Sequence, residues 1–98
     1  MADRAHFDEA LAALLAVGGN LRCNDLVRTL RSLGFDVRDG KKSGHKVVTH
    51  PGIARFSTAA FTCGHGKNPE IKPVYVKKMI SSLRDYESDL IAFLREFP

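Results

Sequence analysis

Apolar residues in the first third of the chain recur at the spacing of an α-helix, in two separate stretches. Over residues 3–20 they fall at steps of four, three and one, which predicts an amphipathic helix ending at Gly18-Gly19. Residues 24–34 predict a second helix, with Asn24 as a suitable N-cap and Gly34 as the terminator. The predicted buried residues are Phe7, Leu11, Leu14 and Leu15 in the first helix, and Leu26, Val27, Leu30 and Leu33 in the second.

Farther along the chain the apolar period changes to two, which is typical of strands with one buried face. Residues 35–38 and 45–50 predict two strands joined through Asp39-Gly40, a strong hairpin signal. A turn at Pro51-Gly52 leads to a third predicted strand over residues 53–62. Three consecutive strands with short connections predict an antiparallel meander.

The final third of the chain begins with a loop rich in glycine and proline. Pro73 fits the first turn of a helix, where its missing N–H costs no hydrogen bond. Apolar residues then recur at steps of three and four, and either Ser81-Ser82 or the polar stretch 84–89 divides this helix in two. The order α-α-β-β-β-α predicts an α+β fold, in which a three-stranded antiparallel meander packs against helices. Its inner α-β-β-β-α part has the order of a double-stranded RNA-binding domain, which is a likeness of topology alone.

Composition favours a single soluble domain over residues 1–98. No apolar run approaches the roughly 18 residues of a membrane span, and no basic leader precedes the longest run. We therefore expect neither a membrane segment nor a secretory signal. The two cysteines, Cys23 and Cys63, are fewer than a disulfide-stapled secreted domain usually carries. We expect both thiols to be free and the protein to be cytoplasmic.

Positive charge is concentrated in the middle of the chain. The formal net charge is +4, yet residues 38–78 hold nine Lys or Arg against two acidic residues. Such a concentration favours a surface that meets nucleic acid or an acidic protein. A solvated basic face without a ligand is the alternative.

One histidine lies within the densest group of lysines, because His45 follows Lys41 and Lys42 and precedes Lys46. RNA cleavage suits this group: an imidazole can take the proton of a ribose 2′-OH or protonate the leaving 5′-oxygen, while ammonium groups bind the phosphate. From the residues alone, an exposed hairpin histidine without a chemical role remains the alternative. His50 lies at an odd offset from His45, so the two rings face opposite sides of a regular strand, and we interpret His50 as a strand-end residue.

The sequence does not favour a metal centre. Cys23, His50, Cys63 and His65 lack the ligand spacing of a zinc site. No paired acids lie near the basic stretch, as a two-metal nuclease needs, and no nucleotide-cofactor motif is present. We expect no metal and no cofactor.

Residues 24–86 resemble the HicA toxins of bacterial type II toxin–antitoxin systems in the order of their motifs. "DLVRTLRSLGFDV" is similar to the family's short amphipathic helix, glycine and aromatic strand. "KKSGHKVVTHPG" is similar to its basic turn, histidine motif and strand ending in "HP", and "CGHGKNPEIKPVYVKKMISSL" to its His-Gly loop and proline-started helix. The glycine and serine before the family's histidine stand here in the reverse order, Ser43-Gly44. Residues 1–20 and 87–98 are helical extensions beyond this core.

The resemblance implies an mRNA interferase with a fold like a double-stranded RNA-binding domain, which cleaves RNA without a metal. It implies that His45 is catalytic and that a HicB-like antitoxin covers the site. The residues then expected to bind RNA are Lys41, Lys42, Ser43, Gly44, Lys46, Arg55, Lys67 and Lys77. The alternative is a non-catalytic module of the same fold that binds RNA or a partner protein. The sequence does not give the oligomeric state.

Overall fold

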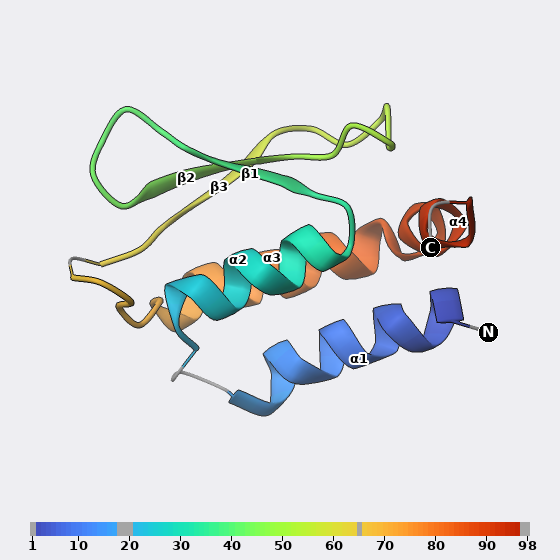
Figure 1. Cartoon of the computed structure of the whole chain (residues 1–98), viewed down its shortest axis with the longest axis horizontal. Helices are drawn as coiled ribbons and strands as arrows, with labels where there is room; N and C mark the ends of the chain where they lie inside the picture. The colour runs from blue at the N-terminus through green and yellow to red at the C-terminus, as the bar shows by residue number, and fades with distance from the viewer. Residues whose placement is uncertain (1, 18–20, 65, 97–98) are drawn as a thin grey trace.

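A three-stranded antiparallel sheet lies over a layer of helices, and the predicted α+β class is confirmed (Figure 1). The computed structural model describes residues 2–17, 21–64 and 66–96. Within these ranges the elements follow the order α1 (Ala2–Val17), α2 (Cys23–Ser32), β1 (Asp36–Asp39), β2 (His45–Thr49), β3 (Ala59–Thr62), α3 (Pro73–Asp85) and α4 (Glu87–Glu96).

The sheet has one face against the helices and one face that no helix covers (Figure 1). The strand order is β1-β2-β3, and Val48 on the central strand pairs with Val37 and Ala59 on its neighbours. Val37, Val48 and Phe61 are buried and so mark the inner face. Because side chains alternate along a strand, His45 points to the outer, uncovered face.

The helices form two tiers beneath the sheet (Figure 1). The core-facing sides of α2 and α3 bury Leu26, Leu30 and Met79 among other residues, and α1 packs against α3 and α4 on the side away from the sheet. Phe7 and Leu14 of α1 are buried as predicted, but Leu15 is 50% exposed, so its place in the core was wrongly predicted. None of the described helices is long and apolar enough to cross a bilayer.

Several helix boundaries follow local signals. Gly34 has a φ of 91° just beyond α2, and Pro73 is the first residue of α3. The predicted division of the last helix occurs in the polar stretch 84–89, at Tyr86. The predicted terminator Gly18-Gly19 lies outside the described residues.

Two boundary predictions are wrong for reasons of tertiary structure. Helix α2 begins at Cys23, so Asn24 lies inside it, and the amide oxygen of Asn68 from a distant loop accepts the Asn24 N–H at 3.0 Å. The third strand begins at Ala59, because residues 53–58 turn towards α4 instead of pairing with β2. In that stretch the N–H of Phe56 donates to the carbonyl of Ile53 at 3.1 Å, which closes a turn.

The two cysteines form a disulfide, so the prediction of free thiols is wrong. The bond joins Cys23, the first residue of α2, to Cys63, the residue after β3, across a sequence separation of 40. The meander carries the end of β3 back over the start of α2, and the two Cα atoms are 5.7 Å apart. Both residues are only 5% exposed.

Candidate functional site

The turn between β1 and β2 holds the lysine-rich sequence in a defined loop. The Gly40 N–H donates to the His45 carbonyl at 2.8 Å, and the His45 N–H donates to the Lys42 carbonyl at 3.1 Å. The Cys63 N–H then donates to the Gly44 carbonyl at 2.8 Å, which fixes the loop against the end of β3. These bonds give His45 a fixed position at the start of β2.

Only glycine fits directly before His45. Gly44 has a φ of 80°, a conformation that L side chains rarely adopt. A Cβ at this position would lie 2.3 Å from the carbonyl oxygen of Cys63, which is backbone and has no alternative rotamer. The order Ser43-Gly44 is therefore the one that this hairpin can accommodate.

The imidazole of His45 lies against the backbone of Gly40 on the outer face of the sheet. A Cβ at Gly40 would be 2.3 Å from Cδ2 of the ring, so any side chain there would displace it. Across the sheet, His45 pairs with Thr62 of β3, whose side chain shares the outer face. The ring thus has a backbone support on one side and a hydroxyl-bearing neighbour on the other.

A pocket of about 580 Å³ opens at this place, and its lining residues are Gly40, Lys41, Lys42, His45, Val47 and Thr62. Among the described residues, neither the His45 ring nor the Thr62 hydroxyl has a side-chain hydrogen bond, and Lys41 and Lys42 form no ion pair. The pocket therefore brings together two uncompensated ammonium groups, an imidazole and a hydroxyl. Such a set can bind a phosphate ester and move a proton beside it.

Three residues that line this pocket, Gly40, Val47 and Thr62, were not predicted as site residues from the sequence. No motif in the sequence marks Thr62, and its place opposite His45 depends on the register of β2 with β3. Gly40 was read as a turn residue only. The hairpin signal at Asp39-Gly40 was available, but the contact of a ring with a glycine backbone requires the tertiary structure.

Lys46 is adjacent to His45 in sequence but has its side chain on the opposite side of the sheet. It forms an ion pair with Asp39, its cross-strand neighbour, and its side chain is 24% exposed. The hydrogen bond from Lys46 holds the pKa of the Asp39 carboxyl below its usual value. The Lys46 ammonium group therefore lies outside the His45 pocket.

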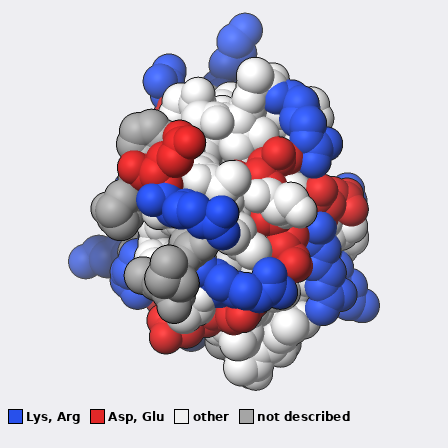
Figure 2. Space-filling view, turned by 90° about the vertical axis from the view of Figure 1, so that its right-hand side faces the viewer, with Lys and Arg blue, Asp and Glu red and all other residues white. Residues whose placement is uncertain are grey.

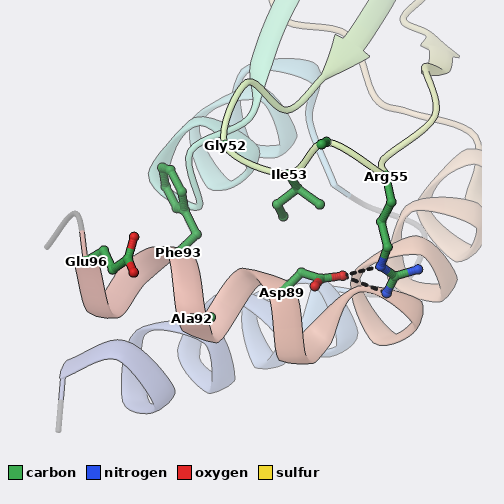
Figure 3. A pocket seen from close by; sticks show the side chains of 8 residues that line it. Gly52, Ile53, Arg55, Asp89, Ala92, Phe93 and Glu96 are labelled. Carbon is green, nitrogen blue, oxygen red and sulfur yellow. Dashed lines mark hydrogen bonds and ion pairs between the residues drawn. The ribbon is translucent and has the colours of Figure 1, made fainter.

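Arg55 lies far from the hairpin, beside α4 (Figure 3). Its guanidinium pairs with the Asp89 carboxylate at 2.6 Å and lies 4.5 Å from the centre of the Tyr86 ring. The end of the molecule that carries α4 has basic and acidic side chains interspersed (Figure 2), including the pair Arg4 and Glu87. This end is therefore not a continuous basic surface.

The other predicted RNA ligands lie in three different places. Ser43 is exposed in the hairpin turn next to Lys42. Lys67 is exposed in the loop that leaves β3, the start of which lies against the hairpin at Gly44. Lys77 lies on α3 and lines a groove with Leu15 of α1, on the side of the helices away from the sheet (Figure 1). Lys67 thus follows the strand end that contacts the hairpin, whereas Lys77 lines a groove with α1, away from the sheet face that carries His45.

His50 is a buried structural histidine just beyond β2. It is 5% exposed, and its ring packs edge-on between Phe35 and Phe93, with centroid distances of 4.7 and 4.6 Å. Nδ1 accepts the Gly52 N–H at 3.1 Å, so the proton is on Nε2, which donates to the Leu33 carbonyl at 3.0 Å. Burial of the ring lowers its pKa from the ordinary value of 6.5.

This arrangement predicts that the protein loses stability on mild acidification. Between the lowered pKa and 6.5 the unfolded chain binds a proton that the folded chain excludes, so the free energy of unfolding falls as the pH drops below 6.5. His50→Gln is expected to cost about 1–3 kcal/mol at pH 8 and to flatten the dependence. The check is urea unfolding across the mildly acidic range, with His6→Gln on the exposed side of α1 as the control. Parallel curves for wild type and His50→Gln would contradict the assignment.

The described residues contain no group of three His, Cys, Asp or Glu side chains that could hold a metal ion together. Cys23 and Cys63 are joined to each other, and a disulfide sulfur is not the thiolate that binds zinc. His65 lies outside the described residues.

No protein-family model, no curated protein and no solved structure matches this chain.

Proposed function

We propose that this protein is a HicA-like mRNA interferase, an endoribonuclease that cleaves unpaired mRNA in the cytoplasm with His45 as its catalytic residue. The observation that carries the proposal is the His45 pocket. There, an imidazole without a hydrogen-bond partner among the described residues lies with Lys41 and Lys42 on the uncovered face of the sheet. The resemblance in the order of motifs over residues 24–86 is its second support.

The proposed reaction uses only groups of the pocket and the RNA. His45 takes the proton of the ribose 2′-OH, and the 2′-oxygen attacks the adjacent phosphorus. Lys41 and Lys42 neutralise the charge that develops on the phosphate oxygens. The bond from phosphorus to the 5′-oxygen breaks, and that oxygen takes up a proton from the imidazolium. The products are a 2′,3′-cyclic phosphate and a 5′-OH, so no metal is needed to activate water.

Unpaired RNA is the expected substrate because its ribose and phosphate can rearrange for attack in line with the leaving oxygen. Contacts to phosphates carry no sequence information, so any sequence preference arises from bases outside the pocket. In this proposal, a HicB-like antitoxin inhibits the enzyme by covering the His45 pocket.

The disulfide constrains the proposed location. Disulfides are uncommon in the reducing cytoplasm, where thiol pools break accessible bonds. Burial of Cys23 and Cys63 restricts the access of a reductant, which supports persistence of this bond there. The cytoplasmic location is therefore part of the proposal. Alkylation of free thiols in intact cells measures whether Cys23 and Cys63 remain joined there.

A non-catalytic RNA-binding module of the same fold is the second candidate. It is favoured by the single imidazole in the pocket, because the described lining residues include no second histidine and no Asp or Glu. RNA that is bound but recovered intact would support this candidate.

The test of the proposed function measures both binding and cleavage of a fluorescent single-stranded RNA in a buffer with EDTA. The wild type is expected to release fragments with cyclic phosphate ends, and the same strand with 2′-deoxy sugars is expected to bind and stay intact. Lys41→Ala with Lys42→Ala is expected to lower the slope of log affinity against log salt by about 1.4, since each phosphate contact in single strands contributes about 0.7.

The matched control for this test is Lys77→Ala with Lys78→Ala, which removes the same charge from α3. An equal loss of affinity in both double variants would show that net charge, and not the pocket, governs RNA binding. Absence of RNA binding by the wild type even at low salt would overturn both candidate functions.

A further inference from the structure

Residues of α1 and α3 line a groove, and α1 lies on the side of the helix layer away from the sheet (Figure 1). The volume of the groove is about 420 Å³, and its lining residues are Leu15, Lys77, Ile80, Ser81, Arg84 and Asp85. We call it the α1/α3 groove. It is remote from the outer face of the sheet where His45 lies, so both surfaces can be occupied at once.

Leu15 of α1 and Ile80 of α3 form the apolar part of the groove. Leu15 is 50% exposed although its helix position suits a core residue, and Ile80 from α3 is only partly buried. Ala12, three residues before Leu15 on the same side of α1, is exposed as well. Covering these side chains would remove apolar surface from water, which is the main driving force for association.

The α3 side of the groove is basic. Lys77 and Arg84 lie two helical turns apart and both line the groove, and Lys78 is exposed beside Lys77. None of these three cations forms an ion pair within the described parts of the chain. Among the described residues, Asp85 is the only acidic one that lines the groove, so the lining has an excess of positive charge.

We propose that the α1/α3 groove is a docking surface for an acidic amphipathic helix of a partner protein. Aliphatic side chains of that helix would cover Leu15 and Ile80, and its carboxylates would lie against Lys77 and Arg84. Apolar anchors flanked by charge on one helical face are the usual features of helix-in-groove recognition.

Charge and shape argue against two other occupants. A nucleic-acid backbone would use the cations but leave Leu15 exposed, because phosphates and sugars do not bury an aliphatic side chain. A second copy of this chain carries a formal charge of +4 and would bring like charges together. An acidic helix matches both the apolar and the basic side of the groove.

The test uses a fluorescent helical peptide with leucines on one face and glutamates on the other, and measures its anisotropy with the full chain. Lys77→Glu with Arg84→Glu is expected to weaken binding about tenfold or more, since two ion pairs become repulsive. Leu15→Ala, at a half-exposed position, is expected to weaken binding several-fold without changing the charge. A peptide with serines in place of leucines is expected to bind about tenfold more weakly than the leucine peptide.

Two controls keep the proposal open to refutation. Lys41→Glu with Lys42→Glu changes the net charge by the same amount, but at the hairpin. If it weakens peptide binding as much as Lys77→Glu with Arg84→Glu does, net charge and not the groove governs the binding. Equal affinity for the serine and leucine peptides would likewise overturn a docking role. Circular dichroism establishes that each variant is folded.

The competing occupants have their own outcomes. Displacement of the peptide by single-stranded RNA, together with weaker direct binding of that RNA to Lys77→Glu with Arg84→Glu, would assign the groove to RNA. A dimer in analytical ultracentrifugation that disappears in Leu15→Ala would assign it to a second copy. None of these measurements depends on cleavage of RNA, so they can fail or succeed independently of the proposed function.

Discussion

His45→Ala is expected to reduce the rate of RNA cleavage by about 10²–10⁴-fold, the usual contribution of a positioned general acid or base. RNA affinity is expected to change little, because Lys41 and Lys42 remain at the rim of the pocket. The reason for this separation is that the ring moves a proton, whereas the ammonium groups hold the phosphate. The measurement is single-turnover cleavage of an RNA that carries one unpaired segment, together with its equilibrium binding.

The control for this prediction is His6→Ala, which removes an exposed histidine from α1. Expression of His45→Ala, His6→Ala and wild type in bacteria adds a second measurement, in which only His45→Ala is expected to relieve a growth defect. Equal toxicity of His45→Ala and wild type would refute the catalytic role of His45. Absence of toxicity and of cleavage in all three would favour the non-catalytic binding module.

Removal of the disulfide is expected to lower the free energy of unfolding by about 4 kcal/mol, from the entropy of closing a loop with a sequence separation of 40. This is a large share of the roughly 5–15 kcal/mol that stabilises most domains. Cys23→Ala with Cys63→Ala is the suitable variant, because both positions are buried and serine would bury an additional hydroxyl.

Urea unfolding with and without a dithiol reductant measures this effect. The reductant is expected to destabilise the wild type and to leave the double variant unchanged. The reductant is also expected to make the position of His45 less fixed. The reason is that the Cys63 N–H holds the hairpin by its hydrogen bond to the Gly44 carbonyl. An unfolding midpoint that is the same for oxidised wild type, reduced wild type and double variant would contradict a stabilising disulfide.

Sequence patterns predicted the fold where the information is local. Helical periodicity located the buried faces of α1 and α2, the alternation of side chains located β1 and β2, and the α+β class followed from their order. Leu15 was misplaced because a helical stripe gives the direction of a face but not its width. The start of β3 was misplaced because Arg55 and its neighbours turn towards α4 through contacts distant in sequence.

The candidate site was predictable in part. His45 and its two preceding lysines were chosen from their spacing, and the structure places all three in one pocket. Thr62 required the strand register, and the disulfide was missed because a count of cysteines indicates a compartment and not a distance. RNA binding at this pocket remains a prediction.

The conformation of Gly44 limits how this hairpin can evolve from one with glycine and serine in the other order. Single substitutions must pass through either two glycines or two serines at positions 43 and 44. A serine at position 44 would place its Cβ 2.3 Å from the Cys63 carbonyl oxygen, so only the two-glycine intermediate keeps the turn intact. Relatives that retain this backbone should therefore vary freely at position 43 and hold glycine at position 44.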